Sequence, residues 1–225
     1  MNQDLKRGLV YLSTITLGLL FSSTAFFGQT SGLTAEWIVS MFVWVLFFQI
    51  YRTTTRKERI EMLTVLAFAT PMELFFSEIW LIYEYQRGFM PLFVPAGHYF
   101  LFDMGRICVR YLKEKITMYA LLPLLPFIVY GFVFGSDTSA ALLLIFVLAF
   151  IKFGRESELY IVMVWLALLM ELWGTYLSNW TWSSNVPWTS LTAWNPPLLV
   201  GAFYCLGDLL VVWSVAKFQS NQQLG

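Results

Sequence analysis

The chain has 225 residues, of which 58% are hydrophobic and 12% are charged. Soluble domains contain about 25% charged residues, so this composition indicates an integral membrane protein rather than a soluble one. The formal net charge is zero, and the absence of a basic excess argues against binding to nucleic acid. Little chain remains outside the apolar runs, so we expect a single transmembrane domain over residues 1–225.

The first apolar run follows Lys6 and Arg7, as it would in a signal peptide. Its length is close to the roughly 20 residues of a spanning helix, whereas the apolar part of a cleavable signal has about 7–15. No clear cleavage site follows it. We therefore interpret this run as an uncleaved first helix.

Apolar runs of spanning length continue along the chain and predict an all-α integral membrane protein with about eight transmembrane helices. The third run contains Pro71, which removes a backbone donor and predicts a kink or tilt. The fourth is rich in polar groups and is open to a second interpretation, as a re-entrant or interfacial element. The eight segments are 8–27, 34–51, 60–84, 97–112, 116–134, 138–153, 158–177 and 198–217.

Basic residues between these segments indicate which connections face the cytoplasm. Cytoplasmic loops carry the excess of Lys and Arg. The odd-numbered connections contain a single basic residue, Arg87. The pattern predicts eight spans with both termini in the cytoplasm. The other basic residues, at the termini and even-numbered connections, are Lys6, Arg7, Arg52, Arg56, Lys57, Arg59, Arg106, Arg110, Lys113, Lys115, Lys152, Arg155 and Lys217.

The seventh connection is unusually rich in tryptophan. It contains Trp180, Trp182, Trp188 and Trp194 within fifteen residues. Indoles favour the headgroup level of a membrane, so one interpretation is an interfacial belt. The other is a lid over a cavity, with the indoles stacked on a ligand.

The two halves of the chain share features that suggest an internal duplication, although chance similarity of apolar segments remains the alternative. Met72-Glu73-Leu74 recurs as Met170-Glu171-Leu172, while Glu78-Ile79-Trp80 competes for the same match. Parallel repeats over 1–113 and 114–225 would place a site between the hairpins of helices 3–4 and 7–8. A second match runs without gaps: Pro91, Tyr99, Leu101 and Asp103 align with Pro196, Tyr204, Leu206 and Asp208.

Ionisable side chains inside apolar segments point to a polar site, because such groups are costly in lipid and usually face a cavity or a partner. We expect Glu78, His98 and Asp103 to supply acid–base chemistry. Asp103 and Arg106 are three residues apart, so an ion pair is the competing interpretation, and His98 could simply be a packing residue. The expected substrate-binding residues are Glu73, Glu84, Arg106, Glu171, Asn179, Trp180, Trp182, Trp194, Asn195, Tyr204 and Asp208.

Three functions fit these residues. The first is a protein with an extracytoplasmic-side polar intramembrane site for a lipid, isoprenoid or lipid-linked substrate. Two versions stay open, one that only binds the substrate and one that also modifies it by acid–base chemistry. The second is a small proton- or cation-coupled transporter that uses Glu73, Glu171 and Asp208. The third is a non-catalytic subunit that has partner membrane subunits.

No metal or cofactor is expected. Cys108 and Cys205 lie in apolar segments and form no metal motif, and the sequence contains no nucleotide-binding motif. The expected partners are membrane lipids and an amphipathic small molecule, with no nucleic acid. The expected location is a bacterial inner (plasma) membrane.

Overall fold

The computed structural model describes residues 2–112 and 118–223, and it is nearly all-α, with 75% of residues in helices. The elements in chain order are α1 (Gln3–Ser22), α2 (Thr24–Phe27), α3 (Gln29–Thr53), α4 (Arg56–Leu74), the π-helix η1 (Phe75–Ile79), β1 (Tyr83–Tyr85), α5 (Val94–Tyr111), the 3-10 helix η2 (Met118–Leu124), α6 (Leu125–Val133), α7 (Ala140–Phe153), α8 (Ser157–Tyr176), β2 (Trp180–Trp182) and α9 (Val200–Gln223).

Among the described residues, helices cover most of each of the eight predicted segments, but 8–27 is divided between α1 and α2, and 116–134 between η2 and α6. Within the described ranges, four helices are long and apolar enough to cross a membrane: Leu33–Thr53, Arg56–Ile79, Ser157–Tyr176 and Val200–Phe218. These four fit a helical membrane protein. Lys113, Lys115 and the start of the segment 116–134 lie outside the described residues.

The expected helix over 60–84 is wrong in its last part. Regular α-helix ends at Leu74, and the chain continues as one π-helical stretch, Phe75–Ile79. Leu81 then adopts a positive φ of 57°, which reverses the chain direction. The following residues form β1, because their backbone pairs with β2 instead of continuing the helical ladder.

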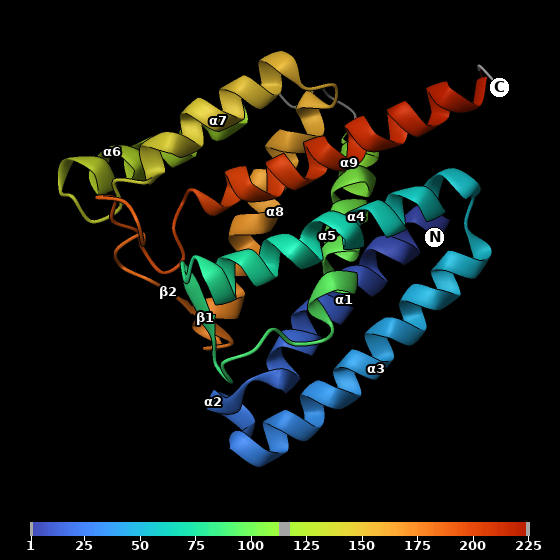
Figure 1. Cartoon of the computed structure of the whole chain (residues 1–225), viewed down its shortest axis with the longest axis horizontal. Helices are drawn as coiled ribbons and strands as arrows, with labels where there is room; N and C mark the ends of the chain where they lie inside the picture. The colour runs from blue at the N-terminus through green and yellow to red at the C-terminus, as the bar shows by residue number, and fades with distance from the viewer. Residues whose placement is uncertain (1, 113–117, 224–225) are drawn as a thin grey trace.

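The strands β1 and β2 pair antiparallel and lie together at one side of the fold (Figure 1). Their register places Tyr83 opposite Trp182 and Tyr85 opposite Trp180. Alternate residues of a strand share a face, so these four aromatic side chains project to the same side of the strand pair. That side faces the helix bundle, because all four side chains are buried.

Four helices form the centre of the bundle. α4 and α9 run side by side (Figure 1), and α5 packs against both α4 and α8. α1 and α3 cover one flank of this centre, and α7 covers another by packing on α8 and α9. Outside the bundle, Ile38, Met41 and Phe42 of α3 are each more than half exposed, as expected of a surface that faces lipid.

Candidate functional site

A cavity of about 140 Å³ lies between α1, α3, α4, α5, α8 and α9, beside the strand pair. Most of its walls are apolar, but seven of the sequence-predicted site residues line it. An apolar pocket with a few convergent polar groups is the usual form of a small-molecule site. The seven residues are Glu73, His98, Glu171, Trp180, Trp182, Tyr204 and Asp208.

Glu73, near the end of α4, is held by both tyrosines of β1. The hydroxyl of Tyr85 donates to Glu73 Oε2 at 2.6 Å, and the hydroxyl of Tyr83 donates to the same oxygen. Burial, reinforced by the charge of Glu73, raises the pKa of both tyrosines above its ordinary value. Both phenols therefore stay protonated and act as fixed donors to the carboxylate.

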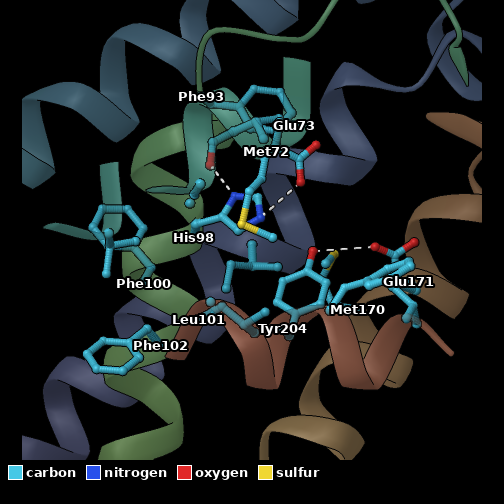
Figure 2. Close-up of a pocket in the computed structure, with 18 of the residues that line it drawn as sticks. Met72, Glu73, Phe93, His98, Phe100, Leu101, Phe102, Met170, Glu171 and Tyr204 are labelled. Carbon is cyan, nitrogen blue, oxygen red and sulfur yellow. Dashed lines mark hydrogen bonds and ion pairs between the residues drawn. The ribbon is translucent and has the colours of Figure 1, made fainter. Parts of the chain in front are cut away.

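His98, in the first turns of α5, faces the other oxygen of Glu73. Its Nε2 lies 3.1 Å from Glu73 Oε1, and its Nδ1 lies 3.0 Å from the carbonyl oxygen of Val94 (Figure 2). A carbonyl only accepts, so Nδ1 carries a proton. The remaining nitrogen shares a proton with the carboxylate, and the ring stacks on Tyr204 with centroids 5.4 Å apart. Both nitrogens of His98 are therefore engaged within the protein.

Glu171, on α8, is held by β2 in the same manner as Glu73 is held by β1. The indole nitrogens of Trp180 and Trp182 donate to Glu171 Oε2 at 2.7 and 2.9 Å. The hydroxyl of Tyr204 lies 3.4 Å from Oε1, a long contact (Figure 2). The two indoles thus fix one oxygen of the carboxyl group, while the other oxygen is only weakly bonded.

Asp208, on α9, is the least satisfied polar group of the cavity. Its side chain is 5% exposed, and its Oδ2 atom has no hydrogen-bond partner among the described residues. An unpaired carboxylate in an apolar interior costs several kcal/mol, so such a group either holds a proton or meets a partner from a ligand. Asp208 is therefore the carboxyl group that is most available to a bound molecule.

Three predicted site residues lie away from the cavity. Glu78 is exposed on η1 and accepts a hydrogen bond from Ser77, and Glu84 is exposed on β1. Trp194 lies beside Tyr130, with ring centroids 6.2 Å apart and ring planes tilted by 41°. None of these three residues lines the cavity.

Two predicted asparagines hold the loops around the strands. The buried Asn179 donates to the carbonyl of Leu19 at 2.9 Å and accepts from Gln86 at 3.1 Å. Asn195 accepts from the backbone N–H of Trp182 at 3.0 Å. Both side chains connect the strand pair to the rest of the fold without reaching the cavity.

The alternative interpretation, an ion pair between Asp103 and Arg106, is wrong, because each residue has a partner on another helix. Arg7 of α1 donates from Nε to Asp103 Oδ2 at 2.8 Å, and Arg106 pairs with Glu61 of α4. Arg7 also lies 3.3 Å from Glu58. These ion pairs form a layer at the start of α4 and in the second half of α5, on the side of the bundle opposite the strands. Within this layer, Asp103 connects α5 to α1.

Sequence reasoning missed Tyr83 and Tyr85 as ligands of Glu73. The signal was present as two short alternations, Tyr83-Glu84-Tyr85 and Trp180-Thr181-Trp182. Period-two spacing places both aromatic residues of each triplet on one face of a strand. The residues follow Glu73 and Glu171 at similar distances along the chain, which is the relation that the structure turns into hydrogen bonds.

Gly174 provides a test of how firmly the indoles are placed. A Cβ atom at this position would lie 2.1 Å from Trp180 Cη2, so Gly174→Ala must displace the indole from Glu171. We expect a loss of about 1–3 kcal/mol in the free energy of unfolding, the usual effect of overpacking. Gly8→Ala is the matched control, because its added Cβ atom would lie 3.5 Å from Ile107. Equal thermal stability of the two variants in detergent would contradict this placement of Trp180.

No group of three or more His, Cys, Asp and Glu side chains able to hold a metal ion occurs within the described ranges. Comparison of the chain with protein-family models, with curated proteins and with solved structures finds no match.

Proposed function

We propose that this chain binds, and modifies by acid–base chemistry, an amphipathic molecule of the lipid or isoprenoid class in the cavity beside the strand pair. The observation that carries the proposal is Asp208, a buried carboxyl group at the wall of an apolar cavity whose Oδ2 atom has no hydrogen-bond partner in the described part of the chain. A protein that only needed a stable core would gain by an apolar residue there.

The volume of the cavity indicates which part of a ligand it holds. An apolar cavity of about 150 Å³ takes up a benzene ring, and this cavity has about 140 Å³. It therefore fits a ring or a few carbon units. A longer chain would extend from it between the apolar surfaces of the helices.

The carboxyl groups divide into two roles in this proposal. Glu73 and His98 are fully bonded to each other, to the tyrosines and to the backbone, so they form a fixed charged wall. Asp208 and the weakly bonded Oε1 of Glu171 are left to exchange protons with the ligand. A pair of carboxyl groups in different surroundings can supply an acid and a base. Glu78 and Asp103 have no part in this arrangement.

We further propose that the chain is an internal duplication in which α4–β1–α5 corresponds to α8–β2–α9. The contacts support it: each first helix supplies a glutamate that is bonded by two aromatic residues of the strand that follows. The strands pair in a symmetric register, and the packing of α4 on α9 mirrors that of α8 on α5. This favours the match of Glu73, rather than Glu78, with Glu171.

The membrane arrangement in the proposal follows the basic residues. Eight spans with both termini in the cytoplasm place the strand pair and the cavity toward the extracytoplasmic side. A bacterial inner membrane is the default location for so compact a chain. In the alternative function, a transporter, Glu73, Glu171 and Asp208 would serve proton coupling. A route from the cavity to both faces of the membrane would distinguish that function.

A substitution that fills the cavity tests for a bound molecule. Gly97 lines the cavity, and a Cβ atom there meets nothing within 4 Å, so Gly97→Leu takes up cavity space without a backbone clash. We expect the wild-type protein to retain an amphipathic compound through purification, and Gly97→Leu to retain at least about tenfold less of it. The compound is measured by mass spectrometry of solvent extracts.

The control is Ala67→Leu, which adds a similar volume at an exposed position of α4 outside the cavity. It should carry the same amount of compound as the wild type. If all three proteins release the same lipids in the same amounts, the cavity binds no specific molecule and the proposal is abandoned in favour of a structural subunit.

A further inference from the structure

A second cavity, of about 390 Å³, lies at the end of the bundle away from the strand pair. It is formed by the start of α4, the end of α5, the start of α8 and the second half of α9 (Figure 1). Its walls combine apolar side chains with charged ones. The apolar residues are Phe102, Val109, Leu159, Val211, Val212, Val215 and Ala216.

The charged side chains of this cavity are mostly basic. Lys57, Arg106, Arg110 and Arg155 face two acidic residues, Glu61 and Glu156, which leaves an excess of two positive charges. Glu61 is committed to Arg106 and lies 4.0 Å from Lys57. Its charge is therefore not available to balance the other arginines.

Two of these arginines are weakly engaged. Arg110 Nε lies 3.6 Å from Asp4, and both side chains are substantially exposed. Arg155 is exposed, and its guanidinium has no ion-pair or hydrogen-bond partner in the part of the chain that the structure describes. An arginine without a partner at the mouth of a basic cavity is free to bind an anion, and guanidinium pairs well with phosphate.

We propose that this second cavity binds the phosphate of an anionic membrane lipid, with Arg155 and Arg110 on the phosphate and the acyl chains against the apolar floor. Basic cavities between membrane helices on the cytoplasmic side are suited to such headgroups. The combination of basic rim and apolar floor favours a lipid over a free anion. Phe102 and Val211 line both cavities and separate the two, so this site is distinct from the one in the proposed function.

The test uses native mass spectrometry of the purified full chain, titrated with phosphatidylglycerol, with phosphatidylcholine and, separately, with inorganic phosphate. We expect tighter binding of phosphatidylglycerol than of phosphatidylcholine. One basic residue near an anionic lipid surface contributes about 1 kcal/mol, so Arg155→Gln should weaken phosphatidylglycerol binding about fivefold. The double variant with Arg110→Gln should weaken it roughly 25-fold.

Lys152→Gln is the control, since Lys152 is an exposed basic residue at the nearby end of α7 that does not line the cavity. It should leave phosphatidylglycerol binding unchanged. Equal affinity for the two lipids, or an equal loss in Lys152→Gln, would overturn the proposal. Competition by inorganic phosphate at the affinity of the lipid would overturn the assignment to a lipid. Arg155→Gln should still retain the compound bound in the first cavity, beside the strand pair. This result keeps the test separate from that of the proposed function.

Discussion

Replacing Arg7 by methionine is expected to destabilise the protein more than any other single substitution in the ion-pair layer. The guanidinium bonds Asp103, whose side chain is 3% exposed, and also contacts Glu58. Removing one partner of a buried ion pair leaves an uncompensated charge and costs about 3–5 kcal/mol. For a chain of this size that corresponds to a fall of roughly 6–20 °C in melting temperature, measured in detergent.

The double variant Arg7→Met with Asp103→Leu separates the burial of charge from the packing of the helices. With both charges replaced by apolar side chains, no ion remains unpaired, and such replacements are often neutral. Glu58 keeps its hydrogen bonds to Thr54 and Thr55 in the cap of α4. We therefore expect the double variant to recover most of the stability, and a double variant as unstable as Arg7→Met would contradict the ion-pair account.

The positions of the helices could be predicted because a spanning segment is a local signal. The expected segments 138–153 and 158–177 correspond to α7 at Ala140–Phe153 and α8 at Ser157–Tyr176. Apolar runs of fixed length produce these elements whatever their neighbours are. The gathering of Glu73, Glu171 and Asp208 at one cavity was also predictable, since ionisable groups in apolar segments must find a shared polar environment.

The partners of these groups could not be predicted, because they are distant in sequence. Asp103 bonds Arg7, which is 96 residues away, although Arg106 has the right helical spacing on the same helix. Spacing along a helix identifies neighbours on its surface, but a buried charge takes whichever partner the packing of helices brings to it. Glu61, the partner of Arg106, was therefore also missed.

The strand pair escaped prediction for a different reason. A strand of three residues is too short for its alternation to stand out from an apolar run, and 60–84 read as one long helix. The positive φ of Leu81 is rare outside glycine and has no clear signal in sequence. The break at Leu81 places Glu84 on the exposed side of β1, outside the cavity, while Glu73 lies before the break and pairs with His98.

Asp208→Leu is expected to stabilise the ligand-free protein and to abolish its function. The carboxyl group is buried and its Oδ2 atom has no partner among the residues described, so an apolar side chain removes an unfavourable burial. We expect the free energy of unfolding to rise by about 1–3 kcal/mol. Turnover of the compound extracted from the wild-type protein should fall by about 10²–10⁴-fold, the usual contribution of an acid–base group. Thermal melts and a turnover assay in membranes measure the two effects.

Asp208→Asn keeps the shape of the side chain and removes only its charge and acid–base capacity, so it should lose turnover without filling the cavity. The opposite behaviour is expected of Asp103→Asn, because Asp103 aligns with Asp208 in the proposed duplication but is paired with Arg7. That variant should lose stability and keep its turnover at temperatures where it is folded. When a substitution raises stability and removes function, the original residue serves function at a cost in stability. If Asp208→Leu is instead destabilised, Asp208 has an unrecognised structural partner and its role in the chemistry falls.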